Sequence, residues 1–241
     1  MPLDTFTGFT PQALTFLRGL KRHNAKPWFE ARRDVYESAL RAPMRLLIEE
    51  VDARLGVIAP EIIGSKRSMF RIHRDVRFSA DKSPYKTHAA VWFYHRDAGH
   101  SVGSQAAHGG AGFYFHLEPG GASMVAGGLW MPAAPVLKQL RMALAEDHKS
   151  FEKILSNASL KRQFGAMDAE AVLTRPPKGY DQDHPAITWL RYKSFTMSQP
   201  LTDEQVQSRK LPDLLATRFA TLLPLVRWLN AATGLPAHSA R

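Results

Sequence analysis

The sequence predicts a single α+β domain with a central, mainly antiparallel sheet and helices from the N- and C-terminal thirds packed on it. Apolar residues recur at helical spacing in the two outer thirds, whereas in the middle third they alternate at every second position. Several strand-like segments follow one another there without an intervening helix, which favours antiparallel pairing. Hydrophobic residues make up 44% of the 241 residues, so the chain can bury a sizeable core.

Three helices are expected in the N-terminal third. The first is capped by Thr10 and has Pro11 at its first position, where proline lacks only a hydrogen that would be unpaired anyway. A second helix begins at Pro27. A third restarts at Pro43 and ends at Gly56, because glycine is the usual residue just beyond a helix.

Four strands are expected in the middle third. The predicted strands cover residues 69–78, 89–95, 112–118 and 124–130. In the first of them Phe70, Ile72 and Val76 share one face, because side chains alternate along a strand. Residues 97–110 are rich in Gly, Ser, Ala and His without periodicity, which predicts a loop.

The helical pattern returns after Pro132 and is followed by a strand and a closing helix. The expected elements are a helix from Pro132, shorter helices near residues 151–155 and 160–164, and a strand over 190–195. Thr202 and Gln205 match a capping box, and the closing helix follows from Leu211 with a bend at Pro224. The domain therefore covers residues 1–234, and residues 235–241 are expected to fray.

The composition excludes several classes of protein. The chain has no cysteine, which excludes disulfides, thiolate nucleophiles and cysteine metal sites. It has neither a signal-like start nor 18 consecutive apolar residues, so we expect a cytoplasmic protein without a membrane partner. The sequence identifies no cofactor and does not fix the oligomeric state.

The charge is unevenly distributed. Lys and Arg total 32 against 22 Asp and Glu, a net charge of +10, and half of this excess falls within residues 66–97. Such a positive field attracts an anionic small molecule, a nucleotide, a nucleic-acid backbone or an acidic protein surface. A solubilising basic face is the alternative interpretation.

Residues 71–87 are dense in hydrogen-bond donors, and their guanidinium, ammonium and hydroxyl groups suit a phosphate or a carboxylate. The expected ligand-binding side chains are Arg71, Arg74, Arg77 and Lys82, completed by Arg191 and Lys193. If the site is catalytic, Tyr85 or Lys86 donates a proton, and Asp75 or His184 acts as the base. Asp75 and Asp81 have a second interpretation, in which they neutralise the arginines in a structural network.

Several motifs in order along the chain match a known family. They are Phe6-Thr7-Gly8-Phe9, Asn24 with Trp28-Phe29, Arg71-Ile72 with Arg74-Asp75 and Arg77-Phe78-Ser79, Asp81-Lys82-Ser83-Pro84-Tyr85-Lys86-Thr87, Gly127-Gly128 with Trp130 and Pro132, and Lys178-Gly179-Tyr180 with His184-Pro185 ahead of Leu190-Arg191-Tyr192-Lys193. Over about residues 6–230 the chain resembles a widespread bacterial and fungal family of conserved hypothetical proteins, catalogued as a domain of unknown function. The resemblance implies a single α+β domain and a pair of asparagines where this chain has His23-Asn24. It implies no activity, substrate or cofactor.

Searches for common catalytic motifs are negative. The sequence contains no Walker phosphate loop, dinucleotide-binding glycine fingerprint, His-Glu-x-x-His zinc helix or Gly-x-Ser-x-Gly elbow. No metal site is predicted, because the spacing of His116 and His184 fits no strong template and a structural role is favoured for both. Gly127-Gly128 is interpreted as a bulge or tight packing within a strand, with close approach to a ligand as the alternative.

Three function classes follow. The favoured one is binding of a phosphate-bearing small molecule or nucleotide, with hydrolysis or transfer if the site is catalytic. The second is nucleic-acid binding by the same basic surface, with Tyr85, Trp92 and Tyr94 available to stack on bases. The third is a scaffold or partner-binding domain in which the basic residues pair with internal acids.

Overall fold

The protein is an α+β domain built on one antiparallel sheet, and the sequence prediction of its fold class is confirmed. The computed structural model describes residues 5–77, 80–101 and 109–238. Five strands pair in chain order, each antiparallel to the next: β1 (Ile62–Ile63), β2 (Ala89–His95), β3 (Gly112–Leu117), β4 (Ser123–Leu129) and β5 (Phe195–Leu201).

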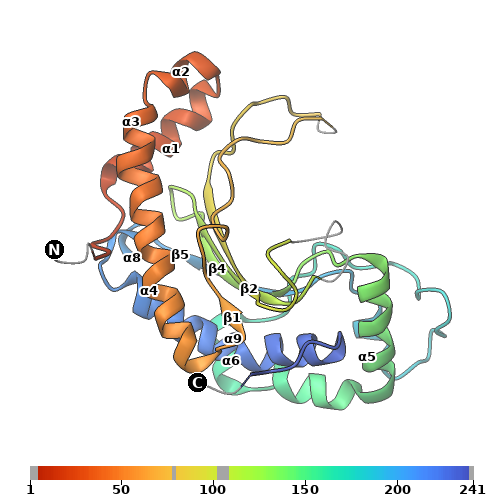
Figure 1. Ribbon diagram of the computed structural model, residues 1–241. Coiled ribbons are helices and arrows are strands. Elements are labelled where there is room, and N and C mark those ends of the chain that lie inside the picture. The colour runs from red at the N-terminus through yellow and green to blue at the C-terminus, as the bar shows by residue number, and fades with distance from the viewer. Residues whose placement is uncertain (1–4, 78–79, 102–108, 239–241) are drawn as a thin grey trace.

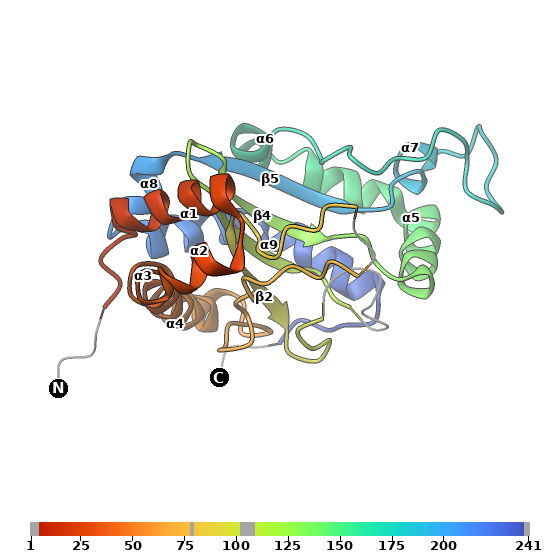
Figure 2. The same ribbon diagram turned by 90° about the horizontal axis from the view of Figure 1, so that it is seen from above.

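Helices from both ends of the chain cover one face of this sheet (Figures 1 and 2). The larger helices are α1 (Pro11–His23), α4 (Ala42–Ile58), α5 (Ala134–Leu155) and α9 (Leu211–Ala232). The shorter ones are α2 (Lys26–Glu30), α3 (Arg33–Val35), α6 (Ala158–Phe164), α7 (Ile187–Leu190) and α8 (Asp203–Gln207). Phe113 of β3 stacks on Phe219 of α9 with ring centroids 4.6 Å apart, which joins the sheet to the closing helix.

Strand alternation divides β3 between two environments. Phe113, Phe115 and Leu117 are fully buried on the helix-covered side. Tyr114 and His116, which point to the opposite side, are half-buried. The polar side chains of β3 therefore lie on the face opposite α9.

The N-terminal helices contain a π-helical turn. The π-helix η1 (Tyr36–Arg41) joins α3 to α4 without a break, and α4 begins at Ala42 with Pro43 in its first turn, close to the predicted restart at Pro43. Proline is tolerated at this point because it occupies the start of α4, where its missing N–H costs no bond of that helix. Short π-helical turns are rare and often lie at functional sites.

Residues 64–77 and 80–88, between β1 and β2, form a projection that we call the arm. Figure 1 shows it rising from the sheet on the side opposite α9. Its two halves meet at only a few points, where Arg74 N–H donates to Pro84 O and Lys86 N–H donates to Ile72 O. The prediction of a regular strand over 69–78 is therefore wrong for residues 69–77, because Pro84 cannot donate to a ladder and the pairing stays isolated. Phe78 lies outside the described residues.

Two further expectations differ from the structure. The strand expected over 190–195 begins only at Phe195, because the N–H groups of Arg191 and Tyr192 close helical bonds at the end of α7. By contrast, the two helices expected after Pro132 do form: α5 consists of two helical stretches that meet at Asp147, whose φ of −140° and ψ of 66° are not helical. Residues 235–238, expected to fray, make specific contacts, including one from His238 to Asp97; residues 239–241 lie outside the described chain.

Tight packing explains one glycine of the Gly127-Gly128 motif. Gly128 has φ +133°, and a Cβ there would lie 2.0 Å from the carbonyl oxygen of Phe195 on the neighbouring strand.

The capping box of Thr202 and Gln205 forms as expected at the start of α8. Among the described residues, no helix is long and apolar enough to cross a membrane.

Candidate functional site

The base of the arm is fixed to the N-terminal helices. The side-chain amide of Asn24 accepts from Tyr85 N–H at 3.0 Å and donates to Tyr85 O at 2.9 Å, as a neighbouring strand would. The Tyr85 ring, 2% exposed, stacks on Phe29 with centroids 4.3 Å apart. Both contacts hold the arm at a set position beside α2 and α3.

A cleft of about 790 Å³ lies between the base of the arm and the helices α3, η1 and α4. Its size is in the range of ordinary small-molecule sites. Its basic lining residues are Arg33, Arg41, Arg45, Lys66 and Arg71, its acidic ones are Glu37, Glu49 and Asp52, and its aromatic ones include Phe29, Tyr36 and Phe70. The cleft thus combines ring surfaces with an excess of positive charge.

The cations of the cleft fall into two groups. Arg41 pairs with Glu37, and Arg33 pairs with Glu30 outside the lining. For Arg45, Lys66 and Arg71, the described part of the chain supplies no ion pair. These three cations are exposed and border the same hollow. They are available to an anion from solution.

The tip of the arm pairs its own charges. Arg74 forms an ion pair with Asp81, and Arg77 pairs with Asp75 at 2.7 Å. Lys82 donates to the carbonyl oxygen of Val76 at 2.9 Å. The hydrogen bonds from Arg77 lower the pKa of Asp75 to about 2, which makes this carboxylate a weak base.

Lys86 lies between the cleft and the sheet. Its Nζ is 5.1 Å from the centroid of the Phe70 ring, a cation–π contact. Burial lowers the pKa of Lys86, and the nearby guanidinium groups of Arg71 and Arg74 lower it further. No carboxylate pairs with this ammonium in the described ranges, and of the three cations only Arg74 has a carboxylate partner there, Asp81. Burial also raises the pKa of Tyr85, which keeps its phenol protonated.

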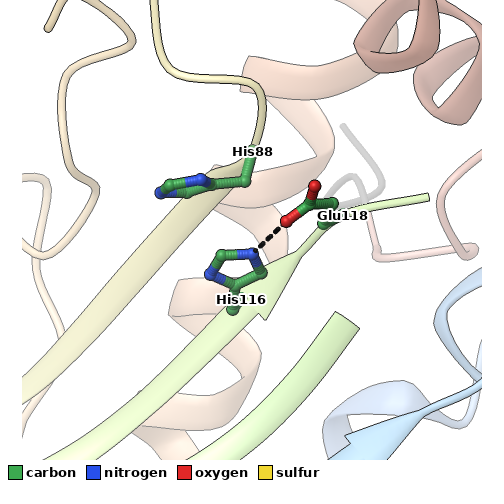
Figure 3. A group of neighbouring side chains, drawn as sticks. All are labelled: His88, His116 and Glu118. Carbon is green, nitrogen blue, oxygen red and sulfur yellow. Dashed lines mark hydrogen bonds and ion pairs between the residues drawn. The ribbon is translucent and has the colours of Figure 1, made fainter. Parts of the chain in front are cut away.

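A second polar group lies on the sheet face beneath the arm, where Figure 3 shows its three central side chains. His116 Nε2 is 3.1 Å from Glu118 Oε2, and His116 Nδ1 is 3.0 Å from the Tyr114 hydroxyl. The His88 ring, from the end of the arm, stacks over His116 with centroids 4.2 Å apart. Lys21 of α1 contacts the other carboxylate oxygen, Glu118 Oε1, at 3.4 Å. We call His88, His116 and Glu118 the histidine cluster.

The surroundings shift the ionisation of this group. Burial and the neighbouring His116 lower the pKa of His88 to about 4, so its imidazole is neutral at pH 7. Burial raises the pKa of Tyr114 to about 12. Burial alone would raise the pKa of Glu118, but the hydrogen bonds from His116 and Lys21 give a net lowering. Perturbed groups gathered in this way are typical of functional sites.

The C-terminal residues of the predicted site lie elsewhere. Arg191 donates to the carbonyl oxygen of Thr174, and Lys193 borders a separate hollow of about 370 Å³ that shares no lining residue with the cleft. His184 accepts from the N–H of Ala186 through Nδ1, at the turn before α7. The structure therefore brings together Arg71, Arg74 and Lys86 from the predicted set, with Arg77 and Lys82 engaged at the tip.

Two groups of described residues could hold a metal ion: the histidine cluster, and a second group that consists of His95, Asp97 and His238. Both ring nitrogens of His95 are already in hydrogen bonds, one with Pro236 O at 2.9 Å and one with the N–H of Asp97 at 3.3 Å. These contacts serve to attach residues 235–238 to the end of β2.

Sequence reasoning missed His88, Arg45 and Lys66. His88 directly follows the donor-rich residues 71–87, and its part in the cluster depends on which residue of β3 it faces. Arg45 lies on α4, where a lone exposed arginine is unremarkable in the sequence. The alternation of Tyr114, His116 and Glu118 was a usable signal, because it predicts a polar face on a buried strand.

A family model described as a conserved hypothetical protein, DUF2461, matches residues 12–228. All the motifs of the resemblance lie within this range, except Phe6-Thr7-Gly8-Phe9. Neither the curated proteins nor the solved structures contain a match to the chain.

Proposed function

We propose that the protein, which belongs to the DUF2461 family of conserved hypothetical proteins, binds a phosphate-bearing small molecule in the cleft between the arm and the helices α3, η1 and α4. The main support is the set of three cations, Arg45, Lys66 and Arg71, that border the cleft without a carboxylate partner in the described chain. Cations that converge on a hollow repel one another, and a bound anion removes this repulsion.

The residue types favour phosphate over a single carboxylate. A guanidinium group presents a planar fork of donors that matches two oxygens of a phosphate, and a lysine adds a point charge. Two arginines and a lysine on facing walls, one from α4 and two from the arm, suit a dianion with several oxygens. The π-helical turn η1, which supplies Tyr36 and Arg41 to the lining, is a further feature that is common at functional sites.

The rest of the lining suits an organic ring attached to the phosphate. Phe29, Tyr36 and Phe70 provide apolar and aromatic surface within the same cleft. Such surfaces bind planar groups by stacking and by exclusion of water. A nucleotide or a similar ring-bearing phosphate is therefore the ligand class that fits both parts of the cleft.

Isothermal titration calorimetry with inorganic phosphate, AMP, ATP, ribose 5-phosphate and a short single-stranded oligonucleotide tests this assignment. We expect saturable binding of at least one small phosphate at two salt concentrations. Arg71→Ala and Arg45→Ala are each expected to raise its Kd about tenfold, because a hydrogen bond to a charged group contributes about 1.5 kcal/mol or more. Arg162→Ala, an exposed arginine of α6 outside the cleft, is the matched control and should leave the Kd unchanged.

Two results would contradict the assignment. The first is that no phosphate binds, or that Arg71→Ala and Arg45→Ala leave the Kd unaltered. The second is tight binding of the oligonucleotide alone, with an affinity that falls steeply with salt and weakens equally in Arg162→Ala. That pattern would favour the nucleic-acid hypothesis, since it reports contacts spread over the basic surface.

A further inference from the structure

The pairing of β2 with β3 places His88, His116 and Glu118 on one face of the sheet. Ala90 lies opposite His116 and Ala89 opposite Leu117. Continuing this register by one residue puts His88 opposite Glu118. Residues that are directly opposite in an antiparallel pair point to the same side, so the two histidines and the carboxylate converge although 27 residues separate His88 from His116.

The geometry points to a metal site: we propose that His88, His116 and Glu118 bind one divalent transition-metal ion of the Zn²⁺ class, independently of the anion-binding cleft. Each residue offers one ligand atom, and these atoms all lie within 4.8 Å of one another. In a tetrahedral site with bonds near 2 Å, ligand atoms are about 3.3 Å apart. His116 Nε2 and Glu118 Oε2 already have a similar separation, 3.1 Å. The His88 ring lies over that of His116 (Figure 3), and on metal binding it turns until one of its nitrogens points at the ion.

His88 is free to act as a ligand. It is half-buried, and neither of its ring nitrogens has a hydrogen-bond partner among the described residues. A neutral imidazole with an unused lone pair is the form that metals bind. The stacking on His116 holds the ring beside the other two ligands without occupying its nitrogens.

His116 has the partner that an imidazole ligand requires. When a metal takes Nε2, the proton of the neutral ring stands on Nδ1, 3.0 Å from the Tyr114 oxygen. That oxygen then accepts the N–H, which fixes the tautomer and the orientation of the ring. Tyr114 is half-buried, so its hydroxyl has a fixed place beside the ring of His116.

The carboxylate of Glu118 divides its two oxygens between different partners. Oε1 faces Lys21 at 3.4 Å, whereas Oε2 faces the histidines. Lys21 is 67% exposed, so its contact is weak and need not break for Oε2 to bind a metal. The negative charge of Glu118 offsets part of the charge of a dication in a region that is otherwise basic.

The ligand types select the ion. Two imidazoles and one carboxylate suit Zn²⁺, Co²⁺, Ni²⁺ or Fe²⁺, whereas Mg²⁺ and Ca²⁺ prefer a set made of oxygens alone. Three protein ligands leave a fourth position for water or for a substrate atom. This arrangement differs from a purely structural zinc site, in which the protein supplies all four ligands.

Titration of the EDTA-treated full-length protein with Zn²⁺ by calorimetry, and with Co²⁺ by visible absorption, tests the site. We expect one ion per chain and a Co²⁺ spectrum typical of four or five ligands. His88→Ala and Glu118→Gln should each weaken Zn²⁺ binding by more than 100-fold. Tyr114→Phe, which removes a supporting hydrogen bond, should weaken it by roughly 10- to 100-fold.

Two control variants make the result specific. His148→Ala removes a half-buried imidazole of α5 that lies outside the cluster, and Asp97→Asn removes a carboxylate of the second group, with His95 and His238. Both should bind Zn²⁺ like the unmodified protein. Each variant is compared by circular dichroism in the metal-free state, and His88→Ala is expected to fold normally because it loses no hydrogen bond between described residues.

The proposal is overturned by three outcomes. They are the absence of stoichiometric binding to the unmodified protein, an unchanged affinity in folded His88→Ala and Glu118→Gln, and loss of binding in Asp97→Asn with the cluster intact. The last outcome would move the metal to the group at the end of β2. None of these outcomes affects the phosphate titration, since the variants of the two experiments share no residue.

Discussion

The base and the tip of the arm contain the same types of basic residue but use them differently. At the base, Lys66, Arg71 and Lys86 lie beside the cleft and the sheet without a carboxylate partner in the described chain. At the tip, Arg74 and Arg77 each hold an aspartate of the arm itself. The base is fixed to the helices through Asn24, whereas the contacts of the tip are local to it.

This difference shows that a high density of cations does not by itself mark a binding site. A cation that already has a neighbouring carboxylate offers little to a ligand, because a new anion must compete with the existing pair. A cation that is held in place without a counter-charge is available. In the structure Asp75 and Asp81 both pair with arginines of the tip, which is the arrangement that their structural interpretation requires.

The largest effect is expected where the base is anchored. Asn24→Ala removes both hydrogen bonds to Tyr85 and leaves its N–H and C=O without partners in a half-buried place. We expect the free energy of unfolding to fall by about 2–3 kcal/mol, since an unsatisfied polar group costs about 1–3 kcal/mol. Urea denaturation of the two proteins measures this difference.

Asn24→Asp separates the two bonds, because it keeps the acceptor for Tyr85 N–H and loses the donor to Tyr85 O. Its stability should lie between those of the unmodified protein and Asn24→Ala. Gln182→Ala, at an exposed amide in the loop before α7, is the control and should change stability by less than about 0.5 kcal/mol. Equal stability of all four proteins would mean that the base of the arm is not anchored by Asn24.

The fold was predictable where a local pattern coincides with a regular partner. The strands near 89–95, 112–118 and 124–130 are short apolar or alternating runs in the sequence, and each has a neighbouring strand along its length. Apolar and polar residues alternate in the arm as well, from Phe70 to Val76. There, however, only isolated bridges form and no strand runs alongside, so a prediction from alternation alone wrongly gives a strand. Residues 190–195 are too few for the spacing of their apolar side chains to distinguish the end of a helix from a strand, so the start of β5 was misplaced.

The site was predictable only in part, because its elements depend on tertiary neighbours. Composition identifies the basic segment, and Arg71 belongs to both the predicted set and the cleft. The contribution of Arg45 depends on how α4 packs beside the arm. His88 and Glu118 meet through the register of β2 and β3, which no spacing within the sequence specifies. The pairing of Arg74 with Asp81 depends on the turn between them.

The next effect in size is expected on the pKa of Asp75 at the tip of the arm, when its partner Arg77 is removed. The bonds from Arg77 lower the pKa of Asp75 from 3.8 to about 2. A carboxyl group whose pKa is lowered on folding stabilises the fold above its unfolded pKa and loses this contribution as the pH falls through its folded pKa. The window is therefore about pH 4 to pH 2. We expect Arg77→Ala to return the NMR-detected midpoint of Asp75 toward 3.8, while Arg162→Ala leaves it near 2. A midpoint that is normal in the unmodified protein would show that the tip does not pair its charges in solution.

The smallest effect is expected from Asp81→Asn. This change removes the charge that Arg74 holds, yet the amide oxygen still accepts the N–H of Ser83. The Asp81 side chain is 54% exposed, and an exposed ion pair contributes about 0–1 kcal/mol because water already solvates both ions. The free energy of unfolding should therefore change by less than about 0.5 kcal/mol, well below the change in Asn24→Ala. The variant also leaves Arg74 without its carboxylate partner. Arg74 at the tip then resembles the cations of the base, which have no carboxylate partner in the described chain. If the contrast between base and tip is correct, phosphate should bind Asp81→Asn at least as tightly as the unmodified protein. A stability loss as large as that of Asn24→Ala would show instead that the tip is as strongly fixed as the base, because the pair would then be an anchor.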